Sequence, residues 1–349
     1  MENRQIPRRR YRGDSDLSII GLGGMALVGM QQSAADKIVN EAIDQGVNYF
    51  DVAPFYGDGQ AEQTMGVSLA PYRDRVFLAC KTLERSARGA QKELDRSLRR
   101  LHTDHCDLYQ FHAVSGMEEV EAIFAPGGAM ETFLRAREHG KVRHIGFSAH
   151  SVDAALAMLD RFQFDSVLFP VNFVCYARGD FGPQVVRKAR ESGVALLAIK
   201  AMAHRPWHKG EKRKYPNCWY RPIEDKELAR QALRFTLSEG ATAAVAPGDE
   251  RLFRMALELA QDLPPLGAGF VRIGYNPAAV CRTDQKSGMT QPDDLHRILL
   301  PARTYVTGMN GMALTAGAND QAYTLTCFLS RPFRSKRTTP SMRAYRVLS

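Results

Sequence analysis

Eight alternations of a strand-like run with a helical segment occupy residues 17–261 and constrain the fold more than any other feature. Each strand-like run is short and apolar, and each following segment carries apolar residues at helical spacing. This order predicts a parallel sheet covered by helices, because a helix must carry the chain back before the next parallel strand begins. Eight such units over roughly 250 residues match a (β/α)8 TIM barrel. The expected strands cover residues 17–23, 48–52, 74–81, 106–112, 141–148, 165–172, 194–202 and 241–248.

Two helix ends carry signals that can be read directly. Ser33 and Asp36 have the spacing of a capping box, which predicts Ser33 as the N-cap of the first helix. Gly140 follows an amphipathic segment and is expected just beyond the end of its helix, where glycine is favoured because it accepts a left-handed backbone.

An open, doubly wound sheet is the alternative architecture for alternating strands and helices. It usually carries a glycine-rich turn directly after a strand, and GLGGMA at residues 21–26 is the candidate in this sequence. That segment lacks a third glycine at the required offset, and Asp51 lies too far along the chain to bind a ribose. The barrel is therefore preferred.

The alternation stops after Pro264 and Pro265. Residues 266–349 show no sustained period of two or 3.6, and their prolines and glycines recur too often for long elements. Of the net charge of +9, this segment carries +7 and residues 1–265 carry +2. We therefore expect a barrel over residues 1–265 and a basic, irregular C-terminal extension over 266–349, poorly ordered or folded as a small module.

The cysteines and the N-terminus indicate a cytoplasmic protein. The six cysteines show no Cys-x-x-Cys spacing, and several lie in apolar runs where a thiol packs as a small apolar group, as suits a reducing compartment. The N-terminal arginine cluster is followed by an apolar stretch, as in an export signal, but Asp14 and Asp16 interrupt it. No segment is long and apolar enough to span a membrane.

Ionisable and hydroxylic side chains accompany the ends of three consecutive strands. Asp51 closes the second expected strand, Tyr56 lies in the loop after it, Lys81 closes the third and His112 closes the fourth. The carboxyl ends of barrel strands meet at one mouth, where catalytic groups gather. Each residue alone also has a structural explanation: a turn cap, a ring over the mouth, a solvated strand end and a core histidine. Their occurrence on consecutive strands favours a shared catalytic role.

Proton donation to a carbonyl oxygen is the chemistry that this set suits. Hydride delivery to a carbonyl carbon builds negative charge on the oxygen, which a donor must then protonate. A free tyrosine is a weak acid with a pKa of about 10. The Lys81 ammonium would favour the phenolate of Tyr56, and Asp51 would keep Lys81 charged. His112 would donate a hydrogen bond that orients the carbonyl oxygen.

Three of these segments also carry a family resemblance: residues 48–66 (NYFDVAPFYGDGQAEQTMG), 78–81 (LACK) and 107–112 (DLYQFH). They resemble the aldo-keto reductases, and the likeness extends over about residues 10–261. The resemblance implies an NADP-dependent oxidoreductase, NAD being the alternative cofactor, that reduces an aldehyde or ketone and needs no metal. Its cofactor would lie extended across the C-terminal mouth of the barrel, which explains why no glycine fingerprint is needed.

The same resemblance implies roles for individual residues. Tyr56 is the general acid, Lys81 and Asp51 are its activating pair, and His112 orients the substrate. Some members of a related branch hold an iron–sulfur cluster in a C-terminal extension. Cys281 and Cys327 are isolated here, so no metal site is expected.

The cofactor positions of the family match less closely than the catalytic ones. The segment GFSAHS resembles the family's nicotinamide-binding segment, with Ala149 where asparagine is usual, and Leu168 stands where glutamine is usual. The segment VAPGDERLFRMALEL resembles the adenosine-phosphate loop, in which a helix start binds phosphate through backbone N–H groups. The cofactor-binding residues that the resemblance implies are Ser148, Asn172, Lys200, Gly248, Asp249, Arg251 and Arg254.

The connection after the seventh strand, AHRPWHKGEKRKYPNCWYRP, is long for a strand-to-helix loop and rich in aromatic and basic residues. We expect it to shape the substrate pocket through Trp207 and Trp219, with Phe55 contributing from the loop after the second strand. A surface loop without ligand contacts is the alternative. Binding of single-stranded nucleic acid ranks below both, because stacking platforms usually lie on an open sheet or groove.

Three functions thus remain in competition. The first is an NADPH-dependent reductase acting on a small-molecule carbonyl substrate. The second is a regulatory or sensor protein that keeps the barrel and cofactor but has little catalysis, as the residues at Ala149 and Leu168 would permit. The third is a barrel recruited by its basic tail to nucleic acid or another anionic surface, with salt-sensitive affinity. The sequence carries no signature of an oligomer interface.

Overall fold

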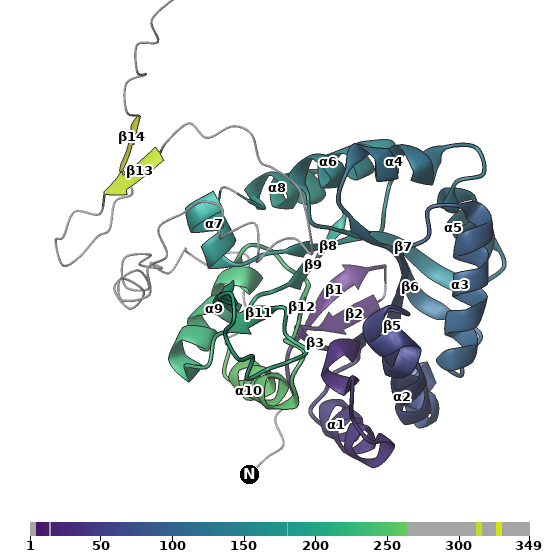
Figure 1. The fold of residues 1–349 in the computed structure, drawn as a ribbon, viewed down its shortest axis with the longest axis horizontal. Coiled ribbons are helices and arrows are strands. Elements are labelled where there is room, and N and C mark those ends of the chain that lie inside the picture. Colours follow the sequence, from purple (N-terminus) through teal and green to yellow (C-terminus); the bar gives the residue numbers. More distant parts are fainter. Residues whose placement is uncertain (1–4, 14, 180, 264–311, 316–325, 330–349) are drawn as a thin grey trace, which may run out of the picture. The chain divides into compact units, whose positions relative to one another are not determined.

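The computed structural model describes residues 5–13, 15–179, 181–263, 312–315 and 326–329. Its main feature is a closed barrel of eight parallel strands, seen end-on in Figure 1, in which the last strand pairs with the first. The (β/α)8 architecture expected from the sequence is therefore confirmed. In barrel order the strands are β12 (Ala243–Val245), β3 (Ile20–Gly23), β4 (Tyr49–Asp51), β5 (Phe77–Thr82), β6 (Cys106–Val114), β7 (Val142–Ala149), β8 (Ser166–Pro170) and β9 (Ala195–Ile199).

Helices cover the outside of the barrel (Figure 1). Four of them begin after a residue whose side chain accepts a hydrogen bond from the first turn: Ser86, Ser151, Asp225 and Asp249. Because these helices follow strands, their N-termini lie at the carboxyl end of the barrel, where their dipoles favour anions. The helices are α1 (Gln32–Asp44), α2 (Gln60–Leu69), α3 (Ala87–Arg100), α4 (Met117–Phe124), α5 (Ala129–Glu138), α6 (Val152–Arg161), α7 (Phe173–Gly179), α8 (Pro183–Glu191), α9 (Lys226–Ser238) and α10 (Glu250–Gln261).

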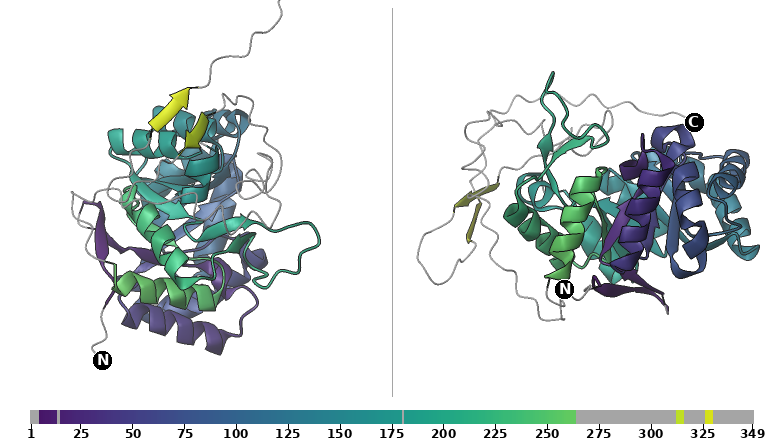
Figure 2. Two further views of the ribbon diagram at one scale, coloured as in Figure 1. Left: turned by 90° about the vertical axis from the view of Figure 1, so that its left-hand side faces the viewer. Right: turned by 90° about the horizontal axis from the view of Figure 1, so that it is seen from below.

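Two hairpins outside the eightfold repeat lie at opposite ends of the barrel (Figure 2). Strands β1 (Arg8–Arg12) and β2 (Ser15–Ser18) cover the amino end, where the Tyr11 ring packs edge-on against Phe77 with ring centroids 5.0 Å apart. Strands β10 (Ala203–Pro206) and β11 (Tyr220–Pro222) pair within the long loop after β9. Packed side chains thus close one end, and a long loop borders the other.

Buried side chains fill the barrel below its mouth. The Tyr49 ring occupies this interior and is fully buried. A Cβ at Gly21 would lie 2.4 Å from Cδ1 of Tyr49, so only glycine leaves room for the ring. Burial of a side chain of this size contributes about 2 kcal/mol. The interior cluster consists of Tyr11, Leu17, Tyr49, Phe77, Ala79, Leu108, Leu168, Leu197 and Ala243.

Some local details differ from the sequence expectations. The capping box at Ser33 and Asp36 is wrong: the N-cap of α1 is Gln31, two residues before Ser33, and it has no side-chain cap hydrogen bond. Asp36 instead accepts a hydrogen bond from Gln32 Nε2 at 2.7 Å. Helices α4 and α7 were not anticipated, because segments of eight and seven residues are too short to display a helical period. Gly140 does adopt the expected left-handed backbone, with φ of 72°.

The C-terminal segment predicted over residues 266–349 lies outside the described residues except for two short strands. Strand β13 (Met312–Thr315) pairs antiparallel with β14 (Thr326–Leu329). The proposed boundary at residue 265 also lies outside them, as α10 ends at Gln261. Within the described part of the chain, every helix is too short or too polar to cross a membrane.

Candidate active site

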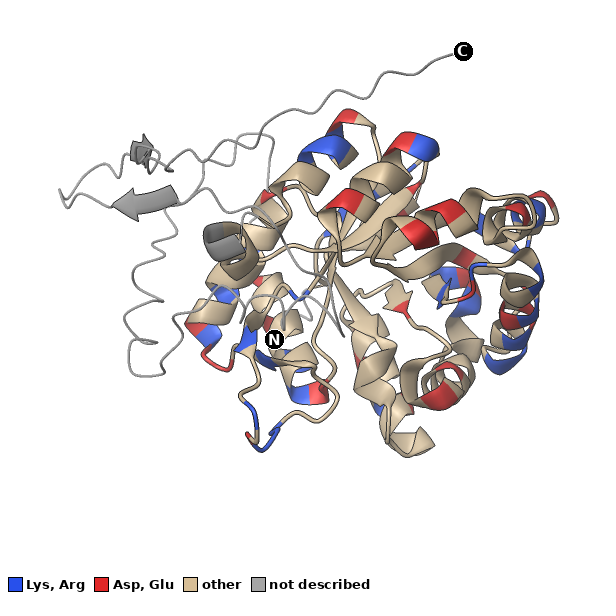
Figure 3. Cartoon of the chain, turned by 45° about the horizontal axis from the view of Figure 1, so that its top comes forward, with Lys and Arg blue, Asp and Glu red and all other residues tan. Residues whose placement is uncertain are grey.

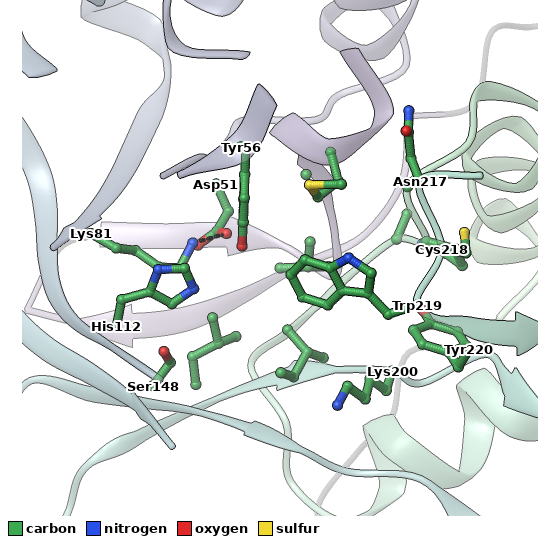
Figure 4. A pocket seen from close by; sticks show the side chains of 18 of the residues that line it. Asp51, Tyr56, Lys81, His112, Ser148, Lys200, Asn217, Cys218, Trp219 and Tyr220 are labelled. Carbon is green, nitrogen blue, oxygen red and sulfur yellow. Dashed lines mark hydrogen bonds and ion pairs between the residues drawn. The ribbon is translucent and has the colours of Figure 1, made fainter. Parts of the chain in front are cut away.

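Four side chains from three neighbouring strands and one loop line a single pocket at the carboxyl end of the barrel (Figure 4). Asp51 ends β4, Lys81 is the penultimate residue of β5, and His112 lies two residues before the end of β6. Tyr56 begins a short turn, Tyr56–Gly59, in the loop after β4. The structure thus brings together the four residues that the sequence singled out, because neighbouring parallel strands end side by side.

Lys81 and Asp51 form a buried ion pair inside the barrel, whereas most charged residues lie on the outer helices and loops (Figure 3). The two residues are 1% and 2% exposed. Lys81 Nζ donates to Asp51 Oδ1, and it also donates to the Val52 carbonyl oxygen at 3.2 Å. Burial is the largest single influence and favours the neutral amine, but the charge and hydrogen bond of Asp51, together with Tyr56 and Cys80, outweigh it and raise the pKa of Lys81. Lys81 is therefore an ammonium at neutral pH.

The second oxygen of Asp51 is held by two neutral donors. Tyr49 Oη donates to Oδ2 at 3.2 Å, and Gln110 Nε2 donates to the same atom at 3.3 Å. Both residues are fully buried. A buried carboxylate is costly unless its lone pairs are satisfied, so these two donors complete the ion pair rather than merely filling space.

Tyr56 lies against this ion pair. Lys81 Nζ is 5.4 Å from the centre of the Tyr56 ring, and the hydroxyl points toward Asp51 and Lys81 in Figure 4. Burial raises the pKa of Tyr56, and the Lys81 ammonium acts in the opposite direction, as the sequence suggested. The net direction is upward, so the expected lowering of this pKa by Lys81 is present but smaller than the effect of burial. Tyr56 is protonated at neutral pH and can act as an acid.

His112 faces Tyr56 from the other side of the pocket. The two rings are nearly perpendicular, at 85°, with centroids 5.8 Å apart. Burial lowers the pKa of His112 well below its usual value, and the nearby charges of Lys81 and Arg85 lower it further. Its Nδ1 is buried without a hydrogen-bond partner among the described residues. The imidazole is therefore neutral, and it can donate or accept one hydrogen bond without competing with Tyr56 as an acid.

Three of the cofactor residues expected from the sequence line the same pocket. Ser148, near the end of β7, accepts a hydrogen bond from the Ala113 N–H through Oγ at 2.7 Å. Lys200 follows β9, is 7% exposed and has a φ of 63°; burial lowers its pKa to about 8. Gly248 packs so closely on the loop after β10 that a Cβ would lie 2.8 Å from the Asn217 carbonyl oxygen.

Asn172 and Asp249 do not line the pocket but occupy helix starts. Asn172 follows β8 and is fully buried; its Oδ1 accepts a hydrogen bond from the Cys175 N–H at 2.9 Å in α7. Its Nδ2 has no hydrogen-bond partner among the described residues. Asp249 caps α10 by accepting from the Arg251 N–H at 3.0 Å. Both side chains therefore have a structural role in addition to any contact with a ligand.

The two arginines of α10 are engaged in surface ion pairs. Arg251 donates to Asp249 through Nε at 3.0 Å and Nη2 at 2.9 Å. Its guanidinium also lies 4.8 Å from the centre of the Tyr215 ring. Arg254 donates to Glu41 of α1 at 2.8 Å and to Glu250 at 2.9 Å. Either arginine would have to exchange a carboxylate partner to bind a phosphate.

The three expected substrate-pocket residues occupy different environments. Trp219 lines the pocket, is 46% exposed, and its ring centroid is 6.4 Å from that of Tyr56. Trp207 lies beside the pocket, where its indole N–H donates to the Cys218 carbonyl oxygen at 2.8 Å. Phe55 does not line the pocket and is 62% exposed. Trp219 is therefore the one of the three that lines the pocket beside Tyr56.

The part of the chain that forms the barrel and the pocket matches a known protein family. A model of the aldo/keto reductase family matches residues 19–248, a range that includes all eight barrel strands as well as Asp51, Tyr56, Lys81 and His112. The chain belongs to the aldo/keto reductase family.

Curated aldo-keto reductases resemble this family member over part of their length. Aldo-keto reductase YhdN from Bacillus subtilis (strain 168) is 35% identical over 155 residues, which cover 40% of this chain and 45% of the relative. Aldo-keto reductase yakc from Schizosaccharomyces pombe, whose name includes NADP(+), is 31% identical over 217 residues, covering 55% of this chain and 60% of the relative. The chain thus spans about half the length of the curated relatives it matches.

Solved structures share the fold of this aldo/keto reductase family member. The holo form of aldo-keto reductase AKR11C1 from Bacillus halodurans aligns with a TM-score of 0.59 and 23% identity, covering 76% of this chain and 93% of that chain. At this identity the likeness shows the fold alone. Among the residues that the structure describes, no three His, Cys, Asp or Glu side chains gather as possible metal ligands.

Sequence reasoning missed three polar residues of this site: Tyr49 and Gln110, which donate to Asp51, and His150. His150 lines the pocket, and its Nδ1 is buried without a hydrogen-bond partner among the described residues. Each of the three lies two positions from a residue that the sequence did single out. Since strand side chains two apart point to the same face, the period of two would have identified them.

Backbone strain is concentrated at the same mouth. Four described residues other than glycine have positive φ, and three of them lie at the carboxyl end of the barrel: Asp58 at 52°, Ala113 at 55° and Lys200 at 63°. Such conformations disfavour residues with a Cβ and persist where the surroundings enforce them, often at functional sites. In this aldo/keto reductase family member, Asp58 lies two residues after Tyr56, Ala113 directly follows His112, and Lys200 lines the pocket.

Proposed function

We propose that this family member is an NADP-dependent oxidoreductase that reduces a small aldehyde or ketone to an alcohol, with Tyr56 as the general acid. One observation carries the proposal: a buried ion pair of Asp51 and Lys81 lies beside a protonated tyrosine, and a neutral imidazole faces that tyrosine. This arrangement offers a proton donor, a cation to stabilise the resulting phenolate, and a second hydrogen bond for the carbonyl oxygen.

A nicotinamide dinucleotide fits the residues of the other side of the pocket. Leu168 and Ile199 offer apolar surface to a ring, and Ser148 offers a hydroxyl. Lys200 places an ammonium in the pocket, and Gly248 brings the backbone close to a ligand just before the N-terminus of α10. Helix N-termini and ammonium groups favour phosphates. When bound, the reduced nicotinamide would supply the hydride; NADP is preferred over NAD because two arginines, Arg251 and Arg254, follow that N-terminus.

The geometry of the chain's own residues supports the proposed proton transfer. As hydride reaches the carbonyl carbon, the Tyr56 O–H bond breaks and its proton passes to the carbonyl oxygen. The phenolate that remains lies beside the Lys81 ammonium, whose charge Asp51 maintains. The neutral His112 donates a hydrogen bond that holds the carbonyl oxygen within reach of Tyr56. All four residues to which this step assigns a role have side chains that line the pocket.

Replacing Tyr56 with phenylalanine tests the proton donor. We expect Tyr56→Phe to lower the turnover of model aldehydes with NADPH by about 100-fold or more, because general acid catalysis typically contributes that much. The dissociation constant of NADPH, measured by protein fluorescence, should change little. Tyr72→Phe is the matched control, since the Tyr72 hydroxyl donates to Asn40 away from the pocket. Wild-type turnover in Tyr56→Phe would refute the role of the phenol.

A sensor or regulatory protein with little catalysis is the second candidate. Leu168 lines the pocket as an apolar residue, and Ala149 is buried next to Ser148 without a polar side chain to offer. The lack of a polar side chain at these two positions could weaken binding of the nicotinamide amide and slow turnover. NADPH oxidation across a panel of aldehydes and quinones separates the candidates, because a sensor would bind NADPH without consuming it.

A cytoplasmic location is also proposed. Cys80, Cys106, Cys175 and Cys218 are buried as free thiols in the described part of the chain, which suits a reducing compartment. Cys281, which was expected to be isolated and to hold no metal cluster, lies outside the described residues.

A further inference from the structure

The peptide group between His112 and Ala113 is held from both sides by side chains of other segments. Arg85 Nη2 donates to the His112 carbonyl oxygen at 2.6 Å. Ser148 Oγ accepts from the Ala113 N–H at 2.7 Å. Both distances are short for such bonds, and they restrain opposite edges of one peptide plane. The orientation of the His112 backbone is therefore fixed independently of the ordinary strand ladder.

This restraint occurs where β6 departs from regular geometry. Phe111 pairs with Phe147 of β7, and Val114 pairs with Ala149. The segment of β6 between these pairs is therefore one residue longer than the segment of β7 opposite it. The extra residue makes a bulge, and Ala113 within it has a φ of 55°. A left-handed alanine is disfavoured on its own. The two hydrogen bonds to the peptide oppose its relaxation.

Arg85 is itself held in place before it reaches His112. Its Nε and Nη2 both donate to Glu119 Oε1, at 3.1 and 2.8 Å, and its Nη1 donates to the Thr82 carbonyl oxygen at 3.3 Å. Glu119 in turn accepts through Oε2 from the Ser115 N–H at 2.7 Å. The Arg85 side chain is 14% exposed and does not line the pocket. It therefore touches neither the expected substrate nor the cofactor.

We propose that Arg85 is a positioning residue for the reaction, which with Ser148 fixes the His112–Ala113 peptide so that the imidazole faces Tyr56. This inference rests on the proposed function. A bulge re-aims the side chain that precedes it, and without the two hydrogen bonds the ring would lose the perpendicular arrangement with Tyr56.

Arg85 has a second, electrostatic influence on His112. The ionisable groups around the imidazole are Lys81 on β5, Arg85 in the loop after β5, Tyr56 after β4, and His150 after β7. Burial is the largest cause of the low pKa of His112, and the charges of Lys81 and Arg85 add to it. Loss of the Arg85 charge should therefore raise the pKa of His112, whereas loss of its hydrogen bond alone should not.

Two substitutions at Arg85 separate position from charge. Arg85→Met removes both the hydrogen bond and the charge, and Arg85→Lys keeps the charge but loses the planar group that bonds Glu119 and the His112 carbonyl together. We expect kcat for carbonyl reduction to fall about ten-fold or more in both variants, since small misplacements of catalytic groups have large effects. The dissociation constant of NADPH should stay the same, because Arg85 lies outside the pocket.

Nitrogen-15 NMR of the histidine side chains gives a readout that does not depend on turnover. With the His112 signal assigned by a His112→Asn variant, the pKa of His112 should rise in Arg85→Met and stay low in Arg85→Lys, while its chemical shifts change in both. Arg96→Met is the matched control, because Arg96 pairs with Glu93 at 2.7 Å on the exposed side of α3. If Arg85→Met destabilises the fold, Glu119→Gln should give a smaller loss of kcat in the same direction.

The outcomes distinguish the two levels of the proposal. If Arg85→Met and Arg96→Met give the same kcat and the same His112 signals, the positioning role is overturned. If kcat falls only in step with a loss of folded protein, it is overturned as well. If the wild type turns over none of the carbonyl compounds, the proposed function fails, whereas a change of the His112 signals in the Arg85 variants still supports the restraint.

Discussion

Two walls of the pocket are built on different principles. We call the side formed by the four proposed catalytic residues the catalytic wall; it consists of Asp51, Tyr56, Lys81 and His112, three of which lie within strands β4, β5 and β6. We call the other side, which holds proposed cofactor-binding residues, the cofactor wall; it consists of residues from β7 onward, among them Ser148, Lys200 and Gly248. On the first wall the strand ladder sets the side-chain positions. On the second, Lys200 and Gly248 lie just past the ends of β9 and β12, where loop conformation sets them.

The difference also appears in the partners of the charges. The buried charges of the catalytic wall are held by each other and by neutral donors, so they need no ligand to be stable. Beyond the cofactor wall, Arg251 and Arg254 are paired with surface carboxylates that solvent can replace. The first wall is preorganised for chemistry, and the second can exchange partners on binding. Perturbing each wall should therefore have a different signature.

The largest effect is expected on the catalytic wall, from Lys81→Met. The substitution leaves Asp51 as a buried carboxylate without its cation, and breaking a buried ion pair costs about 3–5 kcal/mol of unfolding free energy. Turnover should be lost together with stability, because the phenolate of Tyr56 would have no neighbouring cation. Urea unfolding monitored by fluorescence, together with the rate of NADPH oxidation, measures both.

The double variant Asp51→Leu, Lys81→Met serves as the control for that experiment. It removes both charges, so part of the stability should return while turnover stays absent. A single Lys81→Met variant with wild-type stability would show that the pair is solvated and would contradict the buried catalytic wall. Recovery of turnover in the double variant would contradict the role of the ammonium.

The catalytic wall was predictable from the sequence because strands have a period of two and barrel strands end together. Asp51, Lys81 and His112 could be placed at one mouth without coordinates. The bulge at Ala113 could not, since nothing in DLYQFHAV signals an extra residue opposite β7. The hydrogen bond from Arg85 to His112 depends on that bulge and was hidden for the same reason.

Lys200 should give the second effect, a dependence of cofactor affinity on pH. Burial lowers its pKa to about 8, below the ordinary lysine value. If Lys200 binds a cofactor phosphate, the complex favours the ammonium, so affinity is greatest below pH 8 and falls as pH rises through 8. We expect about a ten-fold loss of NADPH affinity across this range, which corresponds to about 1.4 kcal/mol. Fluorescence titrations at pH 7 and pH 9 measure it.

Protein stability without cofactor should respond to the same group with the opposite sign. Between about pH 8 and the higher pKa of the unfolded chain, the unfolded state binds more protons, so the contribution of Lys200 to stability increases as pH rises. Lys200→Met should remove both dependences. An affinity that falls equally with pH in Lys200→Met would assign the titration to another group.

The adenosine end of the cofactor wall was the least predictable part of the site. The likeness of residues 245–259 to a phosphate loop pointed to both arginines of α10 equally. Which of them is available depends on neighbours distant in the sequence: Glu41 of α1 pairs with Arg254, and Tyr215 of the β10–β11 loop lies against Arg251. Those contacts join segments that are distant in the sequence, so the local sequence pattern around the two arginines cannot predict them.

The smallest effect follows from this difference between the arginines. Among the described residues, Arg254 is held by two carboxylates, Glu41 and Glu250, whereas Arg251 is held by one, Asp249, and lies beside the Tyr215 ring. Arg251 exchanges one carboxylate partner rather than two to reach a 2′-phosphate, so Arg251→Gln should weaken NADPH binding more than Arg254→Gln. An exposed ion pair is worth up to about 1 kcal/mol, so the change should be about five-fold or less. NADH binding should be unaffected, because NADH lacks that phosphate.

Equal losses of affinity for NADPH and NADH would exclude a contact with the 2′-phosphate. A larger loss in Arg254→Gln than in Arg251→Gln would assign the contact to Arg254, whose ion pair with Glu41 otherwise links α10 to α1.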